Sequence, residues 1–376
     1  MFNSLFKKLK TKAGSLRPTP AEARLHLYAL PANSGDALVL QFKGDDGKNH
    51  FIWVDGGLVK SYEQTRMVME AITGHDEDID LLVVTHVDQD HIGGILAFAA
   101  DPEAPHERVK RYWFNASRNL AQFFNTRHHP DRELAIPQQG LRSIDQGIKL
   151  ESFLQKENKW HSEPVMRFSM ANLHGLDVYV LGPDEEDLRQ LAERWSDEMQ
   201  DNARDRSIDW GEPKRESLEA LAQKPFEEDD SRPNASSIVL ALEYEGFRIL
   251  LPGDAHPSDL VASLGALGYS KESPVVLDAF KLSHHGSKAS LSPELLDLID
   301  CKNYLISTDG SRHGLPHREA LARIIMHPRN RQRGTTFYFN YNNDGLRAIF
   351  TPGEIKKHRI RCVFPENEAL GAVITF

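Results

Sequence analysis

The sequence predicts an α/β protein in which two β-sheets pack face to face and helices cover the outside. Two observations support this architecture. Short runs of β-branched and aromatic residues recur in two batches, and helical patterns lie between and after them. Strands that recur in this way favour two packed sheets over a single doubly wound sheet. With 376 residues and a 40% apolar fraction, the chain can bury the core that such a fold needs.

The predicted strands fall into three groups along the chain. The first half contains four, at residues 25–30, 37–42, 50–55 and 81–86. The second group contains five, at residues 176–183, 237–244, 247–254, 278–285 and 303–308. A strand-rich stretch closes the chain, at residues 335–341, 346–350, 360–364 and 372–376. Helical periodicity predicts helices at residues 62–73, 92–100, 186–200, 258–267, 293–299 and 319–326.

Two polar, helix-leaning segments interrupt this pattern and are interpreted as insertions, at about 115–172 and 184–232. We therefore expect a basic N-terminal tail (1–24), a main domain (25–334) and a C-terminal strand-rich extension (335–376) packed on that domain. The tail is either frayed or a short amphipathic helix. It lacks the apolar segment and cleavage site of a secretory signal.

Composition predicts a soluble, cytoplasmic protein. No run approaches the roughly 18 to 20 apolar residues that span a bilayer, and two cysteines are too few for a disulfide framework. The net charge of −10 hides an asymmetry. Residues 184–232 hold 17 Asp and Glu against 8 Lys and Arg, whereas residues 310–361 hold 11 Lys and Arg against 3 Asp and Glu. The overall acidity therefore says little about which molecules approach the functional site.

The strongest candidate site follows the predicted strand at 81–86. His86, Asp88, Asp90 and His91 fall within six residues, in a turn between that strand and a helix. Alternation in the extended part sends the first three side chains to one side. Two nitrogen and two oxygen ligands at this spacing form a metal cradle. The alternative is a solvated turn that caps a helix, which would suit Asp90 but leaves the two histidines unexplained.

Further candidates stand at the ends of other predicted strands. Asp254 follows one apolar strand, the pair His284 and His285 follows another, and Asp55 ends a third. Two unit charges about 4 Å apart repel by roughly 4 kcal/mol at an effective dielectric of 20. Asp88, Asp90 and Asp254 could therefore converge only at a high cost without cations. Two divalent ions would remove that cost.

The segment HVDQDHIGG resembles the HxHxDH motif of the metallo-β-lactamase fold, with Asp88 in place of the middle histidine. Together with WVDGG, NASSIVL, LLPGDA and LSHHGS, it is similar to the hydrolase domains associated with competence-type DNA-uptake proteins. The resemblance covers roughly residues 25 to 325, with the motifs in the right order. It implies a four-layer αββα sandwich with a dinuclear metal site at the edges of the sheets.

Carried over by position, the resemblance assigns a role to each motif residue. The implied metal ligands are His86 and Asp88 for the first ion, Asp90, His91 and His284 for the second, and Asp254 for both. Asp55 would orient a ligand histidine, and His285 would face the substrate, although sequence alone does not separate His284 from His285. Where the family usually supplies another histidine to the first ion, this chain has Asn234. That oxygen-rich ligation makes Mn²⁺ a competitor of Zn²⁺.

The resemblance also implies the chemistry. A hydroxide held between the ions would attack phosphorus or a carbonyl carbon, and Asp90 would orient it. His317, just before a predicted helix, is a candidate proton donor to the leaving group; the alternative is a surface histidine at a helix start.

For the substrate, the resemblance favours a phosphodiester and in particular nucleic acid. Arg329, Arg331 and Arg333 in the basic C-terminal stretch would contact phosphates. Phe337 and Phe339 could stack on bases, but they alternate like core residues of a strand. The competing functions are a small-molecule esterase or lactonase and a non-catalytic, ligand-sensing member of the same fold.

Overall fold

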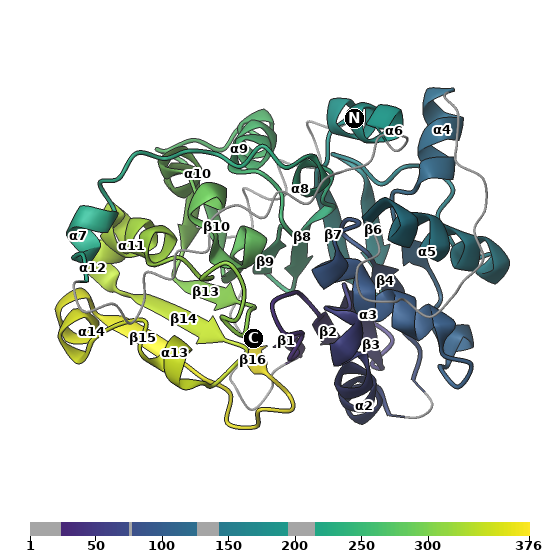
Figure 1. The fold of residues 1–376 in the computed structure, drawn as a ribbon, viewed down its shortest axis with the longest axis horizontal. Helices are drawn as coiled ribbons and strands as arrows, with labels where there is room; N and C mark the ends of the chain where they lie inside the picture. The colour runs from purple at the N-terminus through teal and green to yellow at the C-terminus, as the bar shows by residue number, and fades with distance from the viewer. Residues whose placement is uncertain (1–23, 75–76, 126–142, 195–214) are drawn as a thin grey trace.

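The structure is a computed structural model that describes residues 24–74, 77–125, 143–194 and 215–376 (Figure 1). Almost all of the predicted basic tail therefore lies outside the described residues. The same holds for residues 126–142 of the first expected insertion and residues 195–214 of the second.

The first sheet contains six strands, in the order β16-β1-β2-β3-β4-β5. Neighbouring strands from β16 to β3 are antiparallel, whereas β3, β4 and β5 are parallel. The bounds are β1 (Leu25–Ala29), β2 (Leu38–Lys43), β3 (Asn49–Val54), β4 (Leu81–Val83), β5 (Tyr112–Trp113) and β16 (Ala372–Thr375).

The second sheet contains eight strands, in the order β15-β14-β13-β11-β9-β8-β7-β6. The strands from β9 to β15 in this sheet are parallel, and β6 to β9 are antiparallel. The bounds are β6 (Met170–Leu173), β7 (Leu176–Gly182), β8 (Val239–Tyr244), β9 (Phe247–Leu251), β11 (Ala279–Lys281), β13 (Asn303–Ile306), β14 (Thr335–Phe339) and β15 (Ile360–Val363). A separate parallel pair consists of β10 (Val275–Leu277) and β12 (Ile299–Cys301).

The helices lie mainly outside the sheets (Figure 1). Their bounds are α2 (Tyr62–Thr73), α3 (Gln89–Ala100), α4 (Ser117–Phe124), α5 (Ser143–Glu157), α6 (Glu185–Arg194), α7 (Leu218–Leu221), α8 (Arg232–Ala235), α9 (Pro257–Ala266), α10 (Pro293–Leu298), α11 (Arg318–Met326), α12 (Pro328–Arg333), α13 (Asp344–Arg347) and α14 (Pro352–His358). The described residues also form the short 3-10 helices η2 (Val59–Ser61), η3 (His106–Arg108), η4 (Ser283–Gly286) and η5 (Lys288–Ser290).

Three groups of buried apolar side chains separate four layers. The inner group lies between the sheets and includes Leu27 from the first and Leu240 from the second. One outer group packs α2, α3 and α5 on the first sheet, and the other packs α9, α10 and α11 on the second. Strands alternate between groups: in β9, Ile249 and Leu251 belong to the inner group and Leu250 to an outer one. The predicted αββα sandwich is confirmed.

The C-terminal strands belong to both sheets. β14 and β15 extend the parallel edge of the second sheet, and β16 pairs with β1 at the edge of the first. The Phe376 amide donates to the carbonyl of Leu25 at 2.9 Å, which continues this pairing. The prediction of a strand at residues 346–350 is wrong. The side chain of Asn343 accepts a hydrogen bond from the Leu346 amide at 3.0 Å and starts the short helix α13 there instead.

No helix within the described residues combines the length and the apolar character that crossing a membrane requires.

Candidate metal centre

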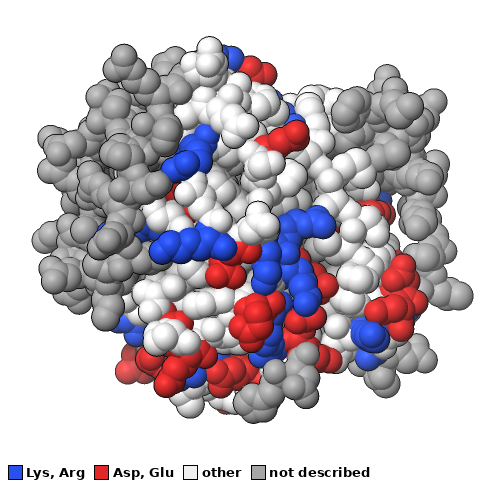
Figure 2. Space-filling view, turned by 90° about the vertical axis from the view of Figure 1, so that its right-hand side faces the viewer, with Lys and Arg blue, Asp and Glu red and all other residues white. Residues whose placement is uncertain are grey.

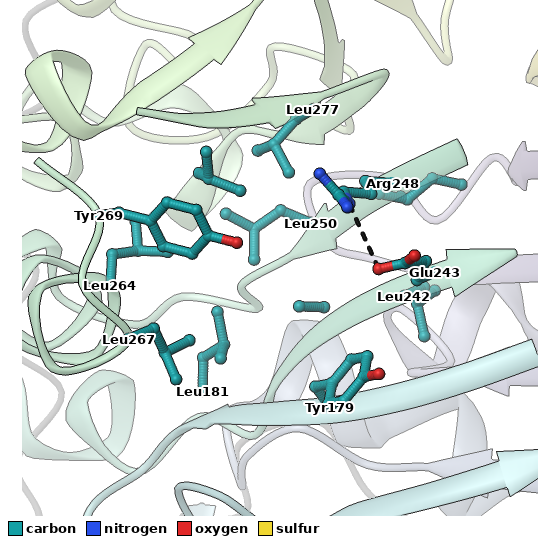
Figure 3. Close-up of a pocket in the computed structure, with 13 residues that line it drawn as sticks. Tyr179, Leu181, Leu242, Glu243, Arg248, Leu250, Leu264, Leu267, Tyr269 and Leu277 are labelled. Carbon is teal, nitrogen blue, oxygen red and sulfur yellow. Dashed lines mark hydrogen bonds and ion pairs between the residues drawn. The ribbon is translucent and has the colours of Figure 1, made fainter. Parts of the chain in front are cut away.

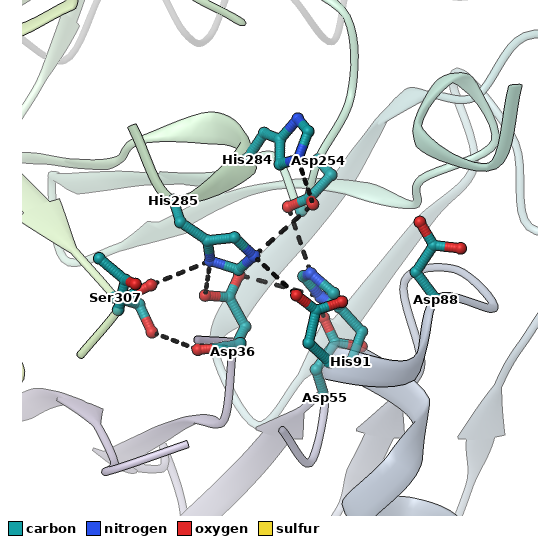
Figure 4. Close-up of polar contacts among 12 residues, drawn as sticks. Asp36, Asp55, Asp88, His91, Asp254, His284, His285 and Ser307 are labelled. Carbon is teal, nitrogen blue, oxygen red and sulfur yellow. Dashed lines mark hydrogen bonds and ion pairs between the residues drawn. The ribbon is translucent and has the colours of Figure 1, made fainter. Parts of the chain in front are cut away.

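The site lies where five strands end at one edge of the sandwich. β3 and β4 of the first sheet are parallel, as are β9, β11 and β13 of the second. The residues that follow these strands are Asp55, His86, Asp254, the pair His284 and His285, and Ser307. Figure 4 shows the side chains of Asp55 from the first sheet and of Asp254, His284, His285 and Ser307 from the second at this edge.

The first segment of the site is the turn from β4 into α3. Asp88 has an extended backbone and precedes the helix, so that Asp90 lies in its first turn and His91 faces the core. Two glycines allow the close packing that fixes this turn. A Cβ atom on Gly35 would lie 1.7 Å from the carbonyl oxygen of Asp90, and one on Gly94 would lie 1.9 Å from that of Gly56.

The second segment is the sharp turn after β11. His284 and His285 both adopt left-handed backbone conformations, with φ of 47° and 54°. Such conformations cost roughly 1 kcal/mol or more for each non-glycine residue. Two main-chain hydrogen bonds hold the turn, from the His284 amide to the Gly253 carbonyl at 3.3 Å and from the His317 amide to the Gly286 carbonyl at 3.0 Å. Backbone strain that the surrounding structure holds in place clusters at functional sites.

Three buried histidines are anchored through their Nδ1 atoms. His86 Nδ1 lies 3.0 Å from Thr85 Oγ, His91 Nδ1 lies 2.8 Å from Asp55 Oδ2, and His285 Nδ1 lies 2.9 Å from the Ser307 carbonyl. Because the Thr85 hydroxyl donates to Asp55 at 2.7 Å, it can only accept from His86. Each neutral ring therefore carries its proton on Nδ1 and presents the lone pair of Nε2.

The Nε2 atoms of these histidines face the interior of the site. Among the residues that the structure describes, none forms a hydrogen bond with Nε2 of His86, His91 or His285, although all three rings are buried. The His91 ring centroid lies 4.2 Å from that of His86 and 5.2 Å from that of His285. Buried polar atoms without partners are costly. Three converging imidazole lone pairs fit a divalent cation.

Carboxylates complete the arrangement. Asp254 Oδ1 lies 3.3 Å from His91 Nε2, and its Oδ2 lies 3.7 Å from His285 Nε2. Asp90 Oδ2 is also 3.7 Å from His285 Nε2. On the other side, Asp88 Oδ2 lies 3.7 Å from His86 Nε2. These separations are close to those between neighbouring ligands on one ion with bonds of about 2.1 Å.

The electrostatics of the centre favour positive charge. Burial alone would lower the pKa of His91, but the carboxylates of Asp254 and Asp55 raise it well above its usual value. Burial would raise the pKa of Asp254, yet His91, His285 and His284 hold it well below its ordinary range. In the ion-free protein a proton on His91 thus offsets the charge of Asp254. A bound cation would replace that proton.

Asp36, which the sequence marks as an aspartate just before a strand, forms a buried ion pair with Lys281, to which sequence reasoning assigned no role. The Lys281 ammonium contacts Asp36, donates to the Gly253 carbonyl at 3.1 Å and lies 3.7 Å from Asp254 Oδ1. Burial opposes both charges, but the pair keeps the pKa of Asp36 low and that of Lys281 high. Asp36 Oδ1 lies 3.3 Å from His285 on the Nδ1 side of the ring. Although Asp36 belongs to a cluster that could hold an ion, this position suits an anchor rather than a ligand.

His284 has its own acidic partner, Asp229. His284 Nδ1 lies 3.5 Å from Asp229 Oδ2, and its Nε2 lies 4.0 Å from Asp254 Oδ2. Burial would lower the pKa of His284, but Asp254 and Asp229 raise it to about 9. Asn234 donates to Asp229 at 2.7 Å and lies 3.3 Å from His284 Nδ1. Asp229 fell within the expected insertion at 184–232, and no pattern in the sequence linked it to the site.

The remaining predicted site residues lie on or before α11 and α12. His317 precedes α11 and accepts a hydrogen bond at Nδ1 from the Lys288 amide at 3.0 Å. Arg329 donates to four main-chain carbonyls, at distances between 2.8 and 3.0 Å. Arg333 pairs with Asp300 at 2.5 Å, whereas Arg331 is exposed. Phe337 and Phe339 are fully buried, so core packing is the correct interpretation for both.

A hollow lies away from these histidines, on the outer face of the second sheet (Figure 3). It lies between β7, β8, β9 and α9, and its lining is apolar apart from the tyrosines Tyr179 and Tyr269 and a pair formed by Arg248 and Glu243 at 3.3 Å. None of its lining residues belongs to the candidate metal centre.

Comparison with known proteins matches the chain to one family model. The model described as the metallo-beta-lactamase superfamily matches residues 35–310, a range that includes every strand-end residue of the site. The chain is 26% identical over 281 residues to ComE operon protein 3 of Bacillus subtilis (strain 168). That alignment covers 73% of this chain and 26% of the relative, so the chain spans about a quarter of the relative's length.

Two solved structures show distant likeness. CmlA, a diiron beta-hydroxylase from Streptomyces venezuelae, matches with a TM-score of 0.40 and 13% identity over 85% of this chain and 53% of that chain. A metallo-beta-lactamase of Cronobacter sakazakii with a HARLDQ motif matches with a TM-score of 0.33 and 12% identity, over 79% of this chain and 91% of that chain.

Proposed function

The chain belongs to the metallo-beta-lactamase superfamily of metal-dependent hydrolases, and on that basis we propose that it is a dinuclear phosphodiesterase that cleaves nucleic acid. The observation that carries the proposal is the convergence of three Nδ1-anchored histidines, His86, His91 and His285, on the buried carboxylate of Asp254. Two divalent ions, Zn²⁺ or Mn²⁺, would supply Lewis acidity and an activated water there.

The proposed ligands fall into two sets that share Asp254. Asp90, His91 and His285 would hold one ion, because His285 Nε2 lies 3.7 Å from both Asp90 and Asp254. His86 and Asp88 would hold the other, together with His284. Figure 4 shows Asp254 between His284 and His91. This assignment gives His285 the place at the second ion that the sequence favoured for His284, and it moves His284 to the first ion.

His284 would then supply the nitrogen that the first site otherwise lacks. The position where the family usually has a histidine is occupied by Asn234, whose amide lies 3.3 Å from His284 Nδ1. Asp229, at 3.5 Å from the same nitrogen, would orient the ring with Nε2 toward Asp254. A carboxylate behind a ligand histidine raises its basicity and fixes its tautomer.

Other residues of the chain would position the reaction. Asp90, 24% exposed at its side chain, is the carboxylate of the second set that can also orient an attacking water. His317 accepts from a main-chain amide at Nδ1, so its neutral ring carries the proton on Nε2 and could deliver it to a leaving group. Lys281 and Asp36 would hold Asp254 and His285 in place from behind.

The choice of nucleic acid as substrate rests mainly on the resemblance of the motif set to DNA-uptake hydrolases. The basic segment at 310–361 adds less than its charge suggests, because Arg318 and Arg323 are buried against Glu354 and Glu319. Figure 2 shows the opposite end of the molecule, near α2, α4 and α5, where the described Lys and Arg side chains lie close to Asp and Glu and form no continuous basic track among the described residues in view.

A panel of substrates tests the proposal. The protein would be loaded with Mn²⁺ or Zn²⁺, its metal content measured, and its activity assayed on bis-p-nitrophenyl phosphate, single-stranded DNA, RNA and a lactone. We expect about two ions per chain and hydrolysis of the phosphodiesters. Asp90→Asn is the matched inactive variant, since it removes a ligand charge at constant volume; we expect a loss greater than tenfold, or about 1.4 kcal/mol.

Each other outcome selects a different function. Hydrolysis of the lactone alone would replace the proposal with a small-molecule esterase. Full metal loading without turnover on any substrate would indicate a ligand-sensing member of the family. A chain that binds no metal would refute the centre itself.

A further inference from the structure

A second group of histidines and carboxylates lies at the opposite end of β3 from the metal centre. It consists of Asp46, His50 and His174, whose nearest ligand atoms lie within 4.8 Å of one another, with Asp80 behind them. His50 is near the start of β3, whereas Asp55 directly follows its end. Five residues of extended chain span roughly 16 Å, so this group is separate from the proposed hydrolytic centre.

His50 is held between two carboxylates. Its Nδ1 lies 3.1 Å from Asp80 Oδ2, and its Nε2 lies 3.0 Å from Asp46 Oδ1. The Phe51 amide also donates to Asp80 Oδ2 at 3.0 Å, which fixes that carboxylate. A neutral imidazole carries one ring proton and can satisfy only one of these acceptors. The other nitrogen then directs its lone pair at a carboxylate oxygen, so either a second proton or a metal ion must lie between them.

His174 brings a second imidazole from the other sheet. It lies in the turn of the β6–β7 hairpin, and its ring stacks on that of His50 with centroids 3.6 Å apart and planes inclined by 15°. Its Nε2 lies 3.3 Å from Asp80 Oδ1. Protonating both rings would place two positive charges face to face. A single divalent ion would leave both imidazoles neutral and still balance the carboxylates.

We propose that Asp46, His50 and His174 bind one divalent transition-metal ion of the zinc class, with Asp80 orienting His50. Two imidazoles and a carboxylate suit Zn²⁺, Ni²⁺ or Cu²⁺ rather than Mg²⁺ or Ca²⁺. Ligands on a tetrahedral ion with bonds of about 2.1 Å stand roughly 3.4 Å apart, which falls between the 3.0 Å of the Asp46 and His50 pair and the 4.8 Å within which the whole group lies. The side chains of Asp46 and His174 are 37% and 43% exposed, so they can turn inward to close the site.

The ion would join the two sheets at this end of the sandwich. The turn before β3 already contacts the β6–β7 hairpin through one hydrogen bond, from the Asp45 amide to the His174 carbonyl at 3.0 Å. β6 is the edge strand of the second sheet. An ion ligated by side chains on both hairpins would hold this edge against the first sheet, and its role would be structural.

Two variants and one control test the site in the full chain. Asp46→Asn removes the ligand charge but keeps an oxygen that can accept from the Lys48 amide, a bond of 2.9 Å. His174→Asn removes the imidazole at a position whose φ of 47° asparagine tolerates well. Asp45→Asn is the control, because it removes the same charge from the same turn without removing a ligand. Each protein would be stripped with a chelator and titrated with Zn²⁺.

We expect the wild type and Asp45→Asn to bind one more Zn²⁺ per chain than Asp46→Asn and His174→Asn. Zn²⁺ should also raise the melting temperature of the wild type more than that of the two ligand variants. Equal stoichiometry in all four proteins, or an equal loss in Asp45→Asn, would overturn the proposal. Phosphodiester hydrolysis should be unchanged in the ligand variants. If the wild type shows no hydrolysis but still binds one more Zn²⁺ than the ligand variants, the proposed function is refuted and the structural site is supported.

Discussion

His284 and His285 are adjacent in sequence but have different surroundings. The His285 side chain is 1% exposed and is held by the Ser307 carbonyl and Asp36, whereas the His284 side chain is 29% exposed. The sequence motif favoured His284 as the ligand of the second ion. In an ideal strand, neighbouring side chains point to opposite faces. That rule does not predict where these two side chains point, because both residues adopt left-handed conformations. Only the contacts of the folded turn separate them.

A matched pair of substitutions tests this difference. His285→Asn should lose metal and turnover more severely than His284→Asn, because it removes a buried, doubly anchored ligand beside Asp90 and Asp254. Asparagine is chosen for both since it tolerates the left-handed backbone. Metal content and hydrolysis would be measured at equal loading. A larger loss in His284→Asn would return that residue to the role that the sequence favoured.

Several positioning residues of the site have no motif of their own. Asp229 and Lys281 are separated from their partners His284 and Asp36 by long stretches of chain, and only the packing of the whole fold brings them together. Asp55, His86 and Asp254 were recognisable from sequence because each stands at the end of a predicted apolar strand. Asp229 and Lys281, which position site residues from distant parts of the chain, have no comparable place in the sequence pattern.

At the scale of elements, the long strands and helices were predictable and the short ones were not. The prediction for residues 62–73 coincides with α2, and most predicted strands agree with the structure within a few residues. The missed strands β5, β6, β10 and β12 contain two to four residues each, too few for periodicity to show. The basic run at 328–333 forms the helix α12, which its charge pattern concealed.

The helix α12 gives separate tests for its arginines. Arg331→Gln removes an exposed charge and should weaken binding of single-stranded DNA at low salt, flattening the slope of log affinity against log salt by roughly 0.7. Its melting temperature should not change. Arg329→Gln should instead destabilise the fold by about 1 to 3 kcal/mol, because carbonyls at the end of α10 lose their donor. Unchanged DNA binding in Arg331→Gln would remove this residue from the substrate path.

Asp187 lies in the first turn of α6, and the negative charge of its carboxylate opposes folding. Burial and the nearby Asp259 raise the pKa of Asp187 to about 7. Since the folded-state pKa exceeds the unfolded value, this group costs stability as the pH rises from about 4 to about 7, and the cost persists above that. Asp187→Asn should therefore stabilise the protein above about pH 7, by on the order of 1 kcal/mol after discounting for solvent screening.

The test for Asp187 is how the difference in melting temperature between the variant and the wild type changes with pH. Below about pH 4 the variant and the wild type should melt at the same temperature, because the carboxyl is protonated in both states. Glu185→Gln, an exposed change in the same turn, is the control and should show no gain at high pH. A gain from Asp187→Asn that is independent of pH would contradict the assignment.

At the scale of the whole molecule, β16 near the C-terminus forms the edge of the first sheet by pairing with β1. Ile374 is 4% exposed and packs in the inner core, whereas Val373 is 37% exposed on the other side of the strand. Ile374→Asp should destabilise the fold by about 3 kcal/mol or more, because it buries a charge and removes core contacts. Val373→Asp should have little effect. Equal melting temperatures for the two variants would mean that β16 does not pair as described.

The candidate metal centre draws its side chains from both sheets, which has a consequence for how the molecule unfolds. His86, Asp88 and His91 follow a strand of the first sheet, whereas Asp254 and His285 follow strands of the second. Bound ions would tie the two halves of the sandwich into one cooperative unit. Chelation would release that coupling, so the two halves could lose structure at different temperatures. The breadth of a calorimetric transition would then report occupancy of the centre without any substrate.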